Sequence, residues 1–338
     1  MIVSKTPFRV SFFGGGTDYP SWFEKNNGSV LSTTIDKYLY ISARYLPPFF
    51  DHKHRIIWSK VELVNKVSDI HHPLIREGLK MMNFNKKLGF DLHYQSDLPA
   101  RSGMGSSSAF AVGLLKALYE LNKKKVTKKI ISRKAIYLER NILGEFVGSQ
   151  DQVAAAYGGL NRINFKKNNT FEVKQINVKQ NRRNELEDKL MLFYTGHSRY
   201  SSNVAESIVK RMNKNNLLLK EMQFIVDEAQ KVLLSKCNLN DFGKLLHESW
   251  SLKRKLSTLV SSNLIDQVYE TAINNGALGG KILGAGNAGF ILIFAEKNYQ
   301  KKIKKSLKKL LYLPFRLSKH GSKIIYNDGK DDLFLNKK

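Results

Sequence analysis

The chain has 338 residues, 42% of them hydrophobic, and 56 lysines and arginines against 29 aspartates and glutamates give it a formal net charge of +27. This size and apolar content are enough to bury a core, which excludes a disordered chain, and the single cysteine, Cys237, excludes an internal disulfide. The charge is compatible with an anionic partner but does not say which one.

Hydrophobic periodicity and turn residues predict a series of strands and helices. In chain order they are strands at 2–13, 30–45, 55–64 and 88–95, helices at 106–122, 127–143 and 151–157, a strand at 189–196, several helices over 202–275, a strand at 289–295, a helix at 298–311 and a strand at 322–326. Runs of strands and of helices, without regular alternation, predict an α+β fold. A polar segment at 166–188 predicts two domains, residues 1–185 and 186–338.

The N-terminus, MIVSKTPFRVSFF, lacks the charged start, apolar block and cleavage site of a signal peptide. No apolar run approaches the length that crosses a bilayer, since the densest, at 290–295, has the length of a strand. We therefore expect a cytoplasmic location and no membrane partner.

Lysine runs at 122–129 and 300–309 carry much of the positive charge. The second run keeps apolar residues at helical spacing, so we expect an amphipathic helix whose basic side faces water. Aromatic residues are not interleaved with these runs, as stacking on single strands requires, so we expect no nucleic-acid partner. Nucleic-acid binding remains the alternative from another class, and its affinity would fall steeply with salt.

The segment PARSGMGSSSAF, residues 99–110, joins a predicted strand to a predicted helix. Unpaired N–H groups and the helix dipole at such a start bind phosphate without a lysine, and glycines let the backbone approach the anion closely. One serine hydroxyl suffices to cap the helix, so a spare one can ligate Mg²⁺. An ordinary capped helix start fits the same residues. The candidate phosphate-binding residues are Gly103, Met104, Gly105, Ser106, Ser107 and Ser108.

Three glycine-rich motifs resemble those of the GHMP small-molecule kinases, a family that includes galactokinase and mevalonate kinase. PARSGMGSSSA resembles the second motif, P-x-x-x-G-L-G-S-S-A, with Met104 in place of leucine. TPFRVSFFGGGTDYP at 6–20 resembles the first motif of the sugar kinases, and GGKILGAGNAGFILIF at 279–294 resembles the third, although Asn287 and Ala288 replace two of its glycines.

This resemblance spans nearly the whole chain. It implies an ATP- and Mg²⁺-dependent kinase with a ribosomal-S5-like N-terminal domain, which binds ATP, and a ferredoxin-like C-terminal domain, which binds the substrate.

Glu139 lies against the apolar face of the helix predicted at 127–143. A carboxylate in that position is costly unless it is paired or binds a metal. An ion pair with Arg133, Lys134 or Arg140 would satisfy it. The resemblance implies instead that Glu139 and Ser107 hold Mg²⁺ on the phosphates.

Asp151 opens a short alanine-rich helix in GSQDQVAAAYGGLN. An N-cap would explain it, but the segment resembles the part of the family in which an aspartate orients or deprotonates the attacking hydroxyl. Arg9 stands where the family has a lysine or arginine close to that aspartate, and its neighbours Phe8 and Val10 point to the opposite face of the strand. A surface position for Arg9 is the alternative.

Gly16, Thr17 and Asp18 are candidate substrate residues, because a tight turn would present a hydroxyl and a carboxylate to sugar hydroxyls. Asp18 fits equally well as the cap of a helix that begins near Pro20. Galactokinase-like sequences carry Glu-His where this chain has Gly15 and Gly16, so the sugar pocket is expected to differ.

Further segments resemble the members of the family that phosphorylate C1 of a heptose 7-phosphate for surface-glycan precursors. They are GGGTDYPSWF, IHHPLIREGLK, FYTGHSRYSS and PFRLSKHGSKIIY. The expected partner is therefore a small sugar phosphate, with Arg199 as the candidate for binding its phosphate and the protein a monomer or homodimer. A kinase for fucose, galactose or an amino sugar remains open, as does a sugar sensor without activity, which the intact Ser107, Glu139 and Asp151 disfavour.

Overall fold

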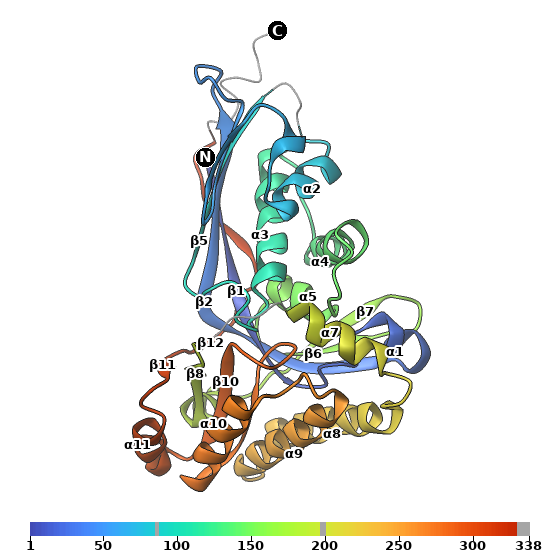
Figure 1. Ribbon diagram of the computed structural model, residues 1–338, viewed down its shortest axis with the longest axis vertical. Coiled ribbons are helices and arrows are strands. Elements are labelled where there is room, and N and C mark those ends of the chain that lie inside the picture. The colour runs from blue at the N-terminus through green and yellow to red at the C-terminus, as the bar shows by residue number, and fades with distance from the viewer. Residues whose placement is uncertain (85–87, 197–200, 330–338) are drawn as a thin grey trace.

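The computed structural model describes residues 1–84, 88–196 and 201–329, which form two β-sheets and their helices (Figure 1). The α+β prediction is confirmed. In the described ranges, no helix is both long and apolar enough to cross a bilayer.

The first sheet is the larger, and its spine is a 19-residue strand, β2. One half of β2 pairs with β1 and β5, and the other half pairs with β1 and β6. All pairs in this sheet are antiparallel except β3 with β5. Its strands are β1 (Ile2–Phe13), β2 (Gly28–Leu46), β3 (His54–Ile57), β4 (Val61–Val64), β5 (Gly89–Ser96), β6 (Asn161–Phe165), β7 (Phe171–Gln175), β12 (Leu317–Ser318) and β13 (Lys323–Asn327).

The second sheet is antiparallel with the order β11-β8-β10-β9. Its strands are β8 (Leu190–Tyr194), β9 (Ala277–Ile282), β10 (Phe290–Ala295) and β11 (Leu311–Leu313). The central strand β10 is buried along its whole length, which agrees with its continuous apolar sequence.

Helices α2 to α5 lie along one face of the first sheet, α9 to α11 gather around the second, and α8 packs against α9 and against β1 and β2 (Figure 1). The helices are α1 (Pro20–Asn26), α2 (Pro73–Met81), α3 (Ser106–Leu121), α4 (Lys128–Tyr137), α5 (Gln150–Tyr157), α6 (Gln180–Lys189), α7 (Ser201–Lys210), α8 (Asn216–Leu234), α9 (Asn240–Leu256), α10 (Asn263–Asn274) and α11 (Lys297–Ser306), with a short 3₁₀ turn at Val67–Asp69.

Two predicted elements are divided in the structure. The strand expected at 55–64 is the hairpin of β3 and β4, closed by a hydrogen bond from the Trp58 N–H to the Lys60 carbonyl. The helix expected at 127–143 is α-helical over Lys128–Tyr137 and continues as a π-helical turn at Leu138–Ile142. This turn contains the buried Glu139. Single π-helical turns inside helices are frequent at functional sites.

The chain returns to the first sheet near its end. Strand β13 pairs with β1, with Ile2 opposite Asn327, and β12 pairs with β2, with Leu317 opposite Ile35. The first sheet therefore combines both ends of the described chain. A division of the chain at residues 185 and 186 stays a prediction.

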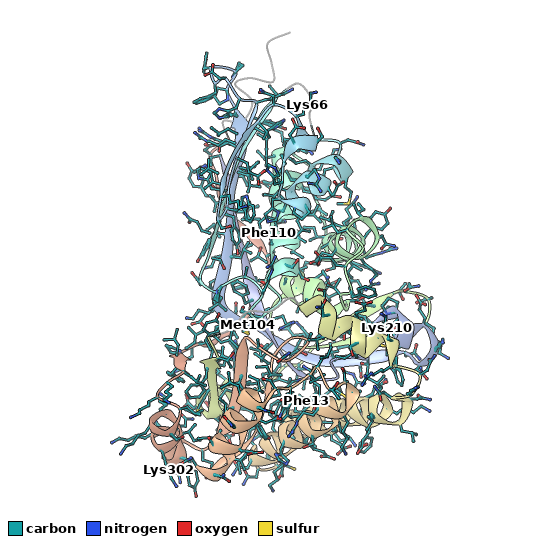
Figure 2. The ribbon with its side chains drawn as sticks, in the orientation of Figure 1. Phe13, Lys66, Met104, Phe110, Lys210 and Lys302 are labelled. Carbon is teal, nitrogen blue, oxygen red and sulfur yellow. The ribbon has the colours of Figure 1, made fainter. Side chains whose placement is uncertain are left out.

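The two sheets meet where the end of β1 packs on α9. The rings of Phe12 and Phe13 lie edge-on to Phe242, with centroids 5.3 and 4.9 Å away. Figure 2 shows Phe13 among the helices that surround the second sheet. The buried Lys281 of β9 donates a hydrogen bond of 2.8 Å to the Phe12 carbonyl. Apolar packing and one buried amine thus fix the first motif against the second sheet.

Candidate active site

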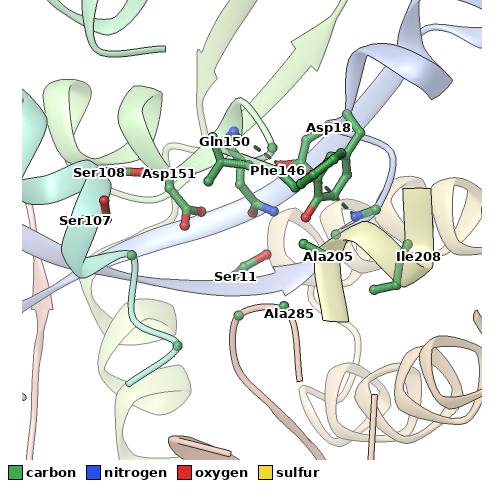
Figure 3. Close-up of a pocket in the computed structure, with 18 of the residues that line it drawn as sticks. Ser11, Asp18, Ser107, Ser108, Phe146, Gln150, Asp151, Ala205, Ile208 and Ala285 are labelled. Carbon is green, nitrogen blue, oxygen red and sulfur yellow. Dashed lines mark hydrogen bonds between the residues drawn. The ribbon is translucent and has the colours of Figure 1, made fainter. Parts of the chain in front are cut away.

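A cavity lies where the two sheets meet (Figure 3). Its walls come from β1, the glycine turn that follows it, the start of α3, the loop before α5, helices α7 and α9, and the loop between β9 and β10. All three glycine-rich motifs contribute residues. The residues that line it include Arg9, Ser11, Gly15, Gly16, Asp18, Gly103, Gly105, Ser106, Ser107, Ser108, Gln150, Asp151, Ala205, Ile208, Lys253, Leu256, Lys281 and Gly284.

The second motif forms the start of α3. Gly105 is the N-cap residue, with a φ of 74° that favours glycine, and no side chain caps this helix. The hydroxyl of Ser106 instead accepts a hydrogen bond from the Arg101 N–H. The first turn of α3 therefore lines the cavity without a capping side chain on its N–H groups, as an anion site requires.

The second and third motifs touch backbone to backbone. A Cβ on Gly103 would lie 2.6 Å from the Leu283 carbonyl oxygen, and one on Gly284 would lie 2.7 Å from the Gly103 Cα. Both residues also have positive φ angles, 78° and 70°. Only glycine fits these two positions, so the loops hold one another in place. Met104, which follows Gly103, is fully buried, as its apolar side chain favours.

Glu139 lies behind the serines, fully buried. Its carboxylate accepts hydrogen bonds from the Ser107 hydroxyl at 2.6 Å, the Ser108 hydroxyl at 2.8 Å and the Gln152 amide at 2.6 Å. Burial raises the pKa of Glu139 to about 7, against the effect of these hydrogen bonds. In the described part of the chain, Glu139 forms no salt bridge, so the ion pair considered for it is not observed.

Arg9 and Asp151 form a two-pronged ion pair. The Nε and Nη2 of Arg9 each lie 2.6 Å from an oxygen of Asp151. The Nη1 of Arg9 donates to the Gly103 carbonyl at 2.6 Å. Only 5% of the Arg9 side chain is exposed, so Arg9 is not a surface residue. Asp151 does not cap α5 either, because that helix begins at Gln150 and its N-cap is Ser149.

Asp18 and Thr17 are buried and bonded within the protein. The Asp18 carboxylate accepts hydrogen bonds from the Gly16 N–H at 3.0 Å and the Gln150 N–H at 3.3 Å. Burial, followed by the charge of Asp151, raises the pKa of Asp18. Asp18 does not cap α1, whose N-cap is Tyr19.

The hydroxyl of Thr17 lies 2.8 Å from the Gly14 carbonyl oxygen and 2.9 Å from that of Ser29. Asp18 and Gly16 line the cavity, whereas Thr17 stabilises the turn beneath it. Arg199, the candidate for binding the substrate's phosphate, lies outside the described residues.

Several cavity residues were not expected from the sequence, among them Ser11, Gln150, Lys253 and Lys281. Lys253 is 5% exposed and donates from Nζ to the Gly284 carbonyl at 2.5 Å. Burial lowers the pKa of Lys253 to about 7 and also lowers the pKa of Lys281. Lys253 is one of several basic residues in α9, so the sequence does not distinguish it from the others. Lys281 lies within the third glycine-rich motif, and its position there is the signal that could have identified it.

Models of the GHMP kinase family match two parts of the chain, the GHMP kinases N terminal domain at residues 73–159 and the GHMP kinases C terminal domain at residues 231–313. A D-glycero-alpha-D-manno-heptose 7-phosphate kinase from Campylobacter jejuni is 31% identical over 91% of this chain and 93% of its own length. A galactokinase from Pyrococcus furiosus is 26% identical over 89% of this chain and 91% of its own length.

Solved structures agree with this relationship. A D-glycero-D-manno-heptose 1-phosphate kinase from Bacteroides thetaiotaomicron covers 97% of this chain and 100% of that chain, with a TM-score of 0.79 and 23% identity, and shows the shared fold. A structure described as a sugar kinase from Campylobacter jejuni has a TM-score of 0.69 and 29% identity, covering 96% of this chain and 97% of that chain. The chain therefore belongs to the GHMP kinase family.

Proposed function

We propose that this protein is an ATP- and Mg²⁺-dependent sugar kinase that phosphorylates the C1 hydroxyl of D-glycero-D-manno-heptose 7-phosphate and yields the 1,7-bisphosphate. One observation carries this proposal. The Asp151 carboxylate, which Arg9 holds through two hydrogen bonds of 2.6 Å, lines the same cavity as the start of α3. The heptose 7-phosphate kinase relative, which aligns over 93% of its length, supports this choice of substrate.

The start of α3 suits the triphosphate. Gly105 presents no side chain, and a Cβ there would lie 3.2 Å from both the Arg9 Cγ and the Asp151 Oδ2. Phosphate oxygens held by the first N–H groups of α3 would therefore lie beside the ion pair. Phosphoryl transfer depends mainly on such positioning and on neutralising charge.

Ser107 and Glu139 fit a magnesium ion. A hydroxyl and a carboxylate are hard oxygen ligands, and their hydrogen bond of 2.6 Å, which brings the two oxygens together, supports a shared ion. Among the described residues, no group of three or more His, Cys, Asp or Glu is placed to hold a metal by itself. This agrees with Mg²⁺, which typically takes one or two carboxylates and completes its shell with phosphate oxygens and water. When bound, the ion would neutralise charge on the phosphates.

In this proposal, Asp151 accepts the proton of the acceptor hydroxyl. The acceptor's C1 hydroxyl gives its proton to the Asp151 carboxylate as its oxygen forms a bond to the γ-phosphorus, and the bond from that phosphorus to the ADP oxygen breaks. Arg9 orients the carboxylate through both of its oxygens, and its third contact, to the Gly103 carbonyl, ties that orientation to the phosphate loop. Arg9 thus aligns the base with the phosphates.

The test is ADP release from Mg-ATP with a panel of acceptors: D-glycero-D-manno-heptose 7-phosphate, mannose 6-phosphate, mannose, galactose, fucose and N-acetylgalactosamine. We expect the heptose 7-phosphate to give the highest kcat/KM, with a product that carries phosphate at C1 by ³¹P NMR. A higher kcat/KM for a free hexose would contradict the substrate and favour a kinase for an unphosphorylated sugar.

A further inference from the structure

Two buried polar groups face the cavity without a partner. In the described chain, neither the Ser11 hydroxyl nor the Gln150 side-chain carbonyl has a hydrogen-bond partner, and the residues are only 5% and 8% exposed. Figure 3 shows both side chains on the walls of the cavity. Buried polar groups are nearly always hydrogen-bonded, so an unpaired pair in a substrate cavity indicates that the substrate supplies the partner.

The space between these groups exists because residue 15 is glycine. A Cβ on Gly15 would lie 3.7 Å from the Gln150 Nε2 and 3.9 Å from the Ser11 Oγ, which are ordinary contact distances. Gly14 and Gly16 have positive φ angles of 79° and 108°, but Gly15 is not among the described residues with positive φ. The backbone does not require glycine at position 15, so the missing side chain leaves room in the cavity.

Ser11 and Gln150 lie close in sequence to the proposed catalytic pair, Ser11 to Arg9 on β1 and Gln150 to Asp151 on α5. Ser11 follows Arg9 by two residues on β1, and the unbroken register across this stretch puts both on one face of the strand. Gln150 precedes Asp151 in the first turn of α5. A molecule whose hydroxyl faces Asp151 therefore has its neighbouring atoms between Ser11 and Gln150.

The chemistry of the walls selects a neutral, hydroxylated ligand segment. A serine hydroxyl and a glutamine amide both donate and accept hydrogen bonds and carry no charge, which matches sugar hydroxyls rather than phosphate. Ala205 and Ile208 of α7 and Leu256 of α9 provide apolar surface in the same cavity. Such surface suits the C–H groups of a sugar.

We propose that Ser11, Gln150 and the space left by Gly15 form a specificity pocket that binds hydroxyl groups of the acceptor sugar. This inference rests on the proposed sugar kinase activity and names residues that select its acceptor. The pocket binds through hydrogen bonds from Ser11 and Gln150 and admits the sugar only because position 15 has no side chain.

The test compares Ser11→Ala, Gln150→Leu and Gly15→Ala in steady-state kinetics with saturating Mg-ATP and varied D-glycero-D-manno-heptose 7-phosphate. We expect the KM for the sugar to rise about 3- to 10-fold in each hydrogen-bond variant and about 10-fold or more in Gly15→Ala. The KM for ATP should change less than about twofold, a split that a general loss of structure would not produce.

Ser32→Ala is the matched control. Ser32 lies opposite Ser11 on the neighbouring strand, and its hydroxyl is also buried and has no partner among the described residues, but it does not line the cavity. This variant should keep the wild-type KM for the sugar. Melting temperatures of all variants show whether they fold.

Unchanged KM values for the sugar in both folded Ser11→Ala and Gln150→Leu would overturn the specificity pocket. If the wild-type protein prefers another sugar, the heptose proposal fails, and the same variants measured with that sugar still test the pocket. Wild-type protein that phosphorylates no sugar in the panel would overturn both proposals.

Discussion

The two ends of the cavity differ in how their polar groups are satisfied. At the phosphate end, the Ser107 and Ser108 hydroxyls donate hydrogen bonds to Glu139. Arg9 donates hydrogen bonds to both oxygens of Asp151 and to the Gly103 carbonyl. At the acceptor end, the Ser11 hydroxyl and the Gln150 carbonyl have no partner in the described chain. In the proposed function, the phosphate end is thus organised by the protein alone, whereas the acceptor end would be completed by hydrogen bonds from the sugar. Groups that are fixed before binding stabilise the transition state of the reaction. Groups that find their hydrogen-bond partner only on the bound substrate contribute to the choice of substrate.

Asp151→Asn gives the strongest test of the preorganised end. The amide keeps the shape of the carboxylate but accepts no proton, so we expect kcat to fall by about 10²- to 10⁴-fold with little change in either KM. Coupled detection of ADP release measures the rate. The melting temperature should fall modestly, because Arg9 loses a charged partner in a largely buried position.

Asp227→Asn is the control for that variant. Asp227 pairs with Arg162 on the surface of α8, with 44% of its side chain exposed, and it lies outside the cavity. It should keep the wild-type rate. Asp151→Asn with a near-wild-type kcat would remove the proton-accepting role and leave Asp151 a structural partner of Arg9.

Ser107→Ala tests the same end through the metal. The variant removes one hydroxyl from the expected magnesium site, and we expect the Mg²⁺ concentration for half-maximal rate to rise about 10- to 100-fold. Magnesium titrations at fixed ATP measure it. Ser132→Ala is the matched control, because its buried hydroxyl bonds the Lys128 carbonyl at 2.8 Å, away from the cavity. Equal magnesium requirements in the two variants would contradict a metal role for Ser107.

Sequence reasoning named the cavity residues at the start of α3 but not Ser11 or Gln150, for a physical reason. Residues 103–108 are contiguous, and the rules for a helix start operate within a few residues, so glycines and serines there are informative by themselves. The acceptor end is assembled from β1, α5, α7 and α9. Ser11 lies within a mostly apolar strand, and nothing local distinguishes it from a core serine.

For the fold too, the sequence predicted local elements better than the contacts between distant parts of the chain. Alternating and apolar runs predicted β1 and β10 well, because burial on a sheet leaves its period in the sequence. No local pattern predicted that β13 pairs with β1, since that contact joins the two ends of the described chain. Likewise, the contact of Gly103 with Leu283 depends on the packing of two sheets. Long-range pairing, rather than local propensity, was the missing information.

Lys253 lies between the two ends and gives the smallest expected effect. Burial and, to a smaller extent, the charge of Arg9 lower the pKa of its amine, whereas Asp18 and Asp151 raise it. Burial lowers the pKa of Lys253 to about 7, so near pH 8 the amine is mostly neutral in the free protein. A triphosphate that enters the cavity favours the charged form and raises this pKa, so the protein takes up a proton on binding.

We therefore expect the binding of a non-hydrolysable Mg-ATP analogue near pH 8 to take up a fraction of one proton, measured by titration calorimetry in buffers of different ionisation enthalpy. The contribution of Lys253 to this uptake should vanish near pH 6, where its amine is already protonated. Lys253→Met should reduce the uptake near pH 8 and reduce kcat about tenfold, whereas Lys255→Met, an exposed position on the same helix, should change neither. Equal uptake in both variants would mean that another group titrates, and that Lys253 serves only to hold the Gly284 carbonyl at 2.5 Å.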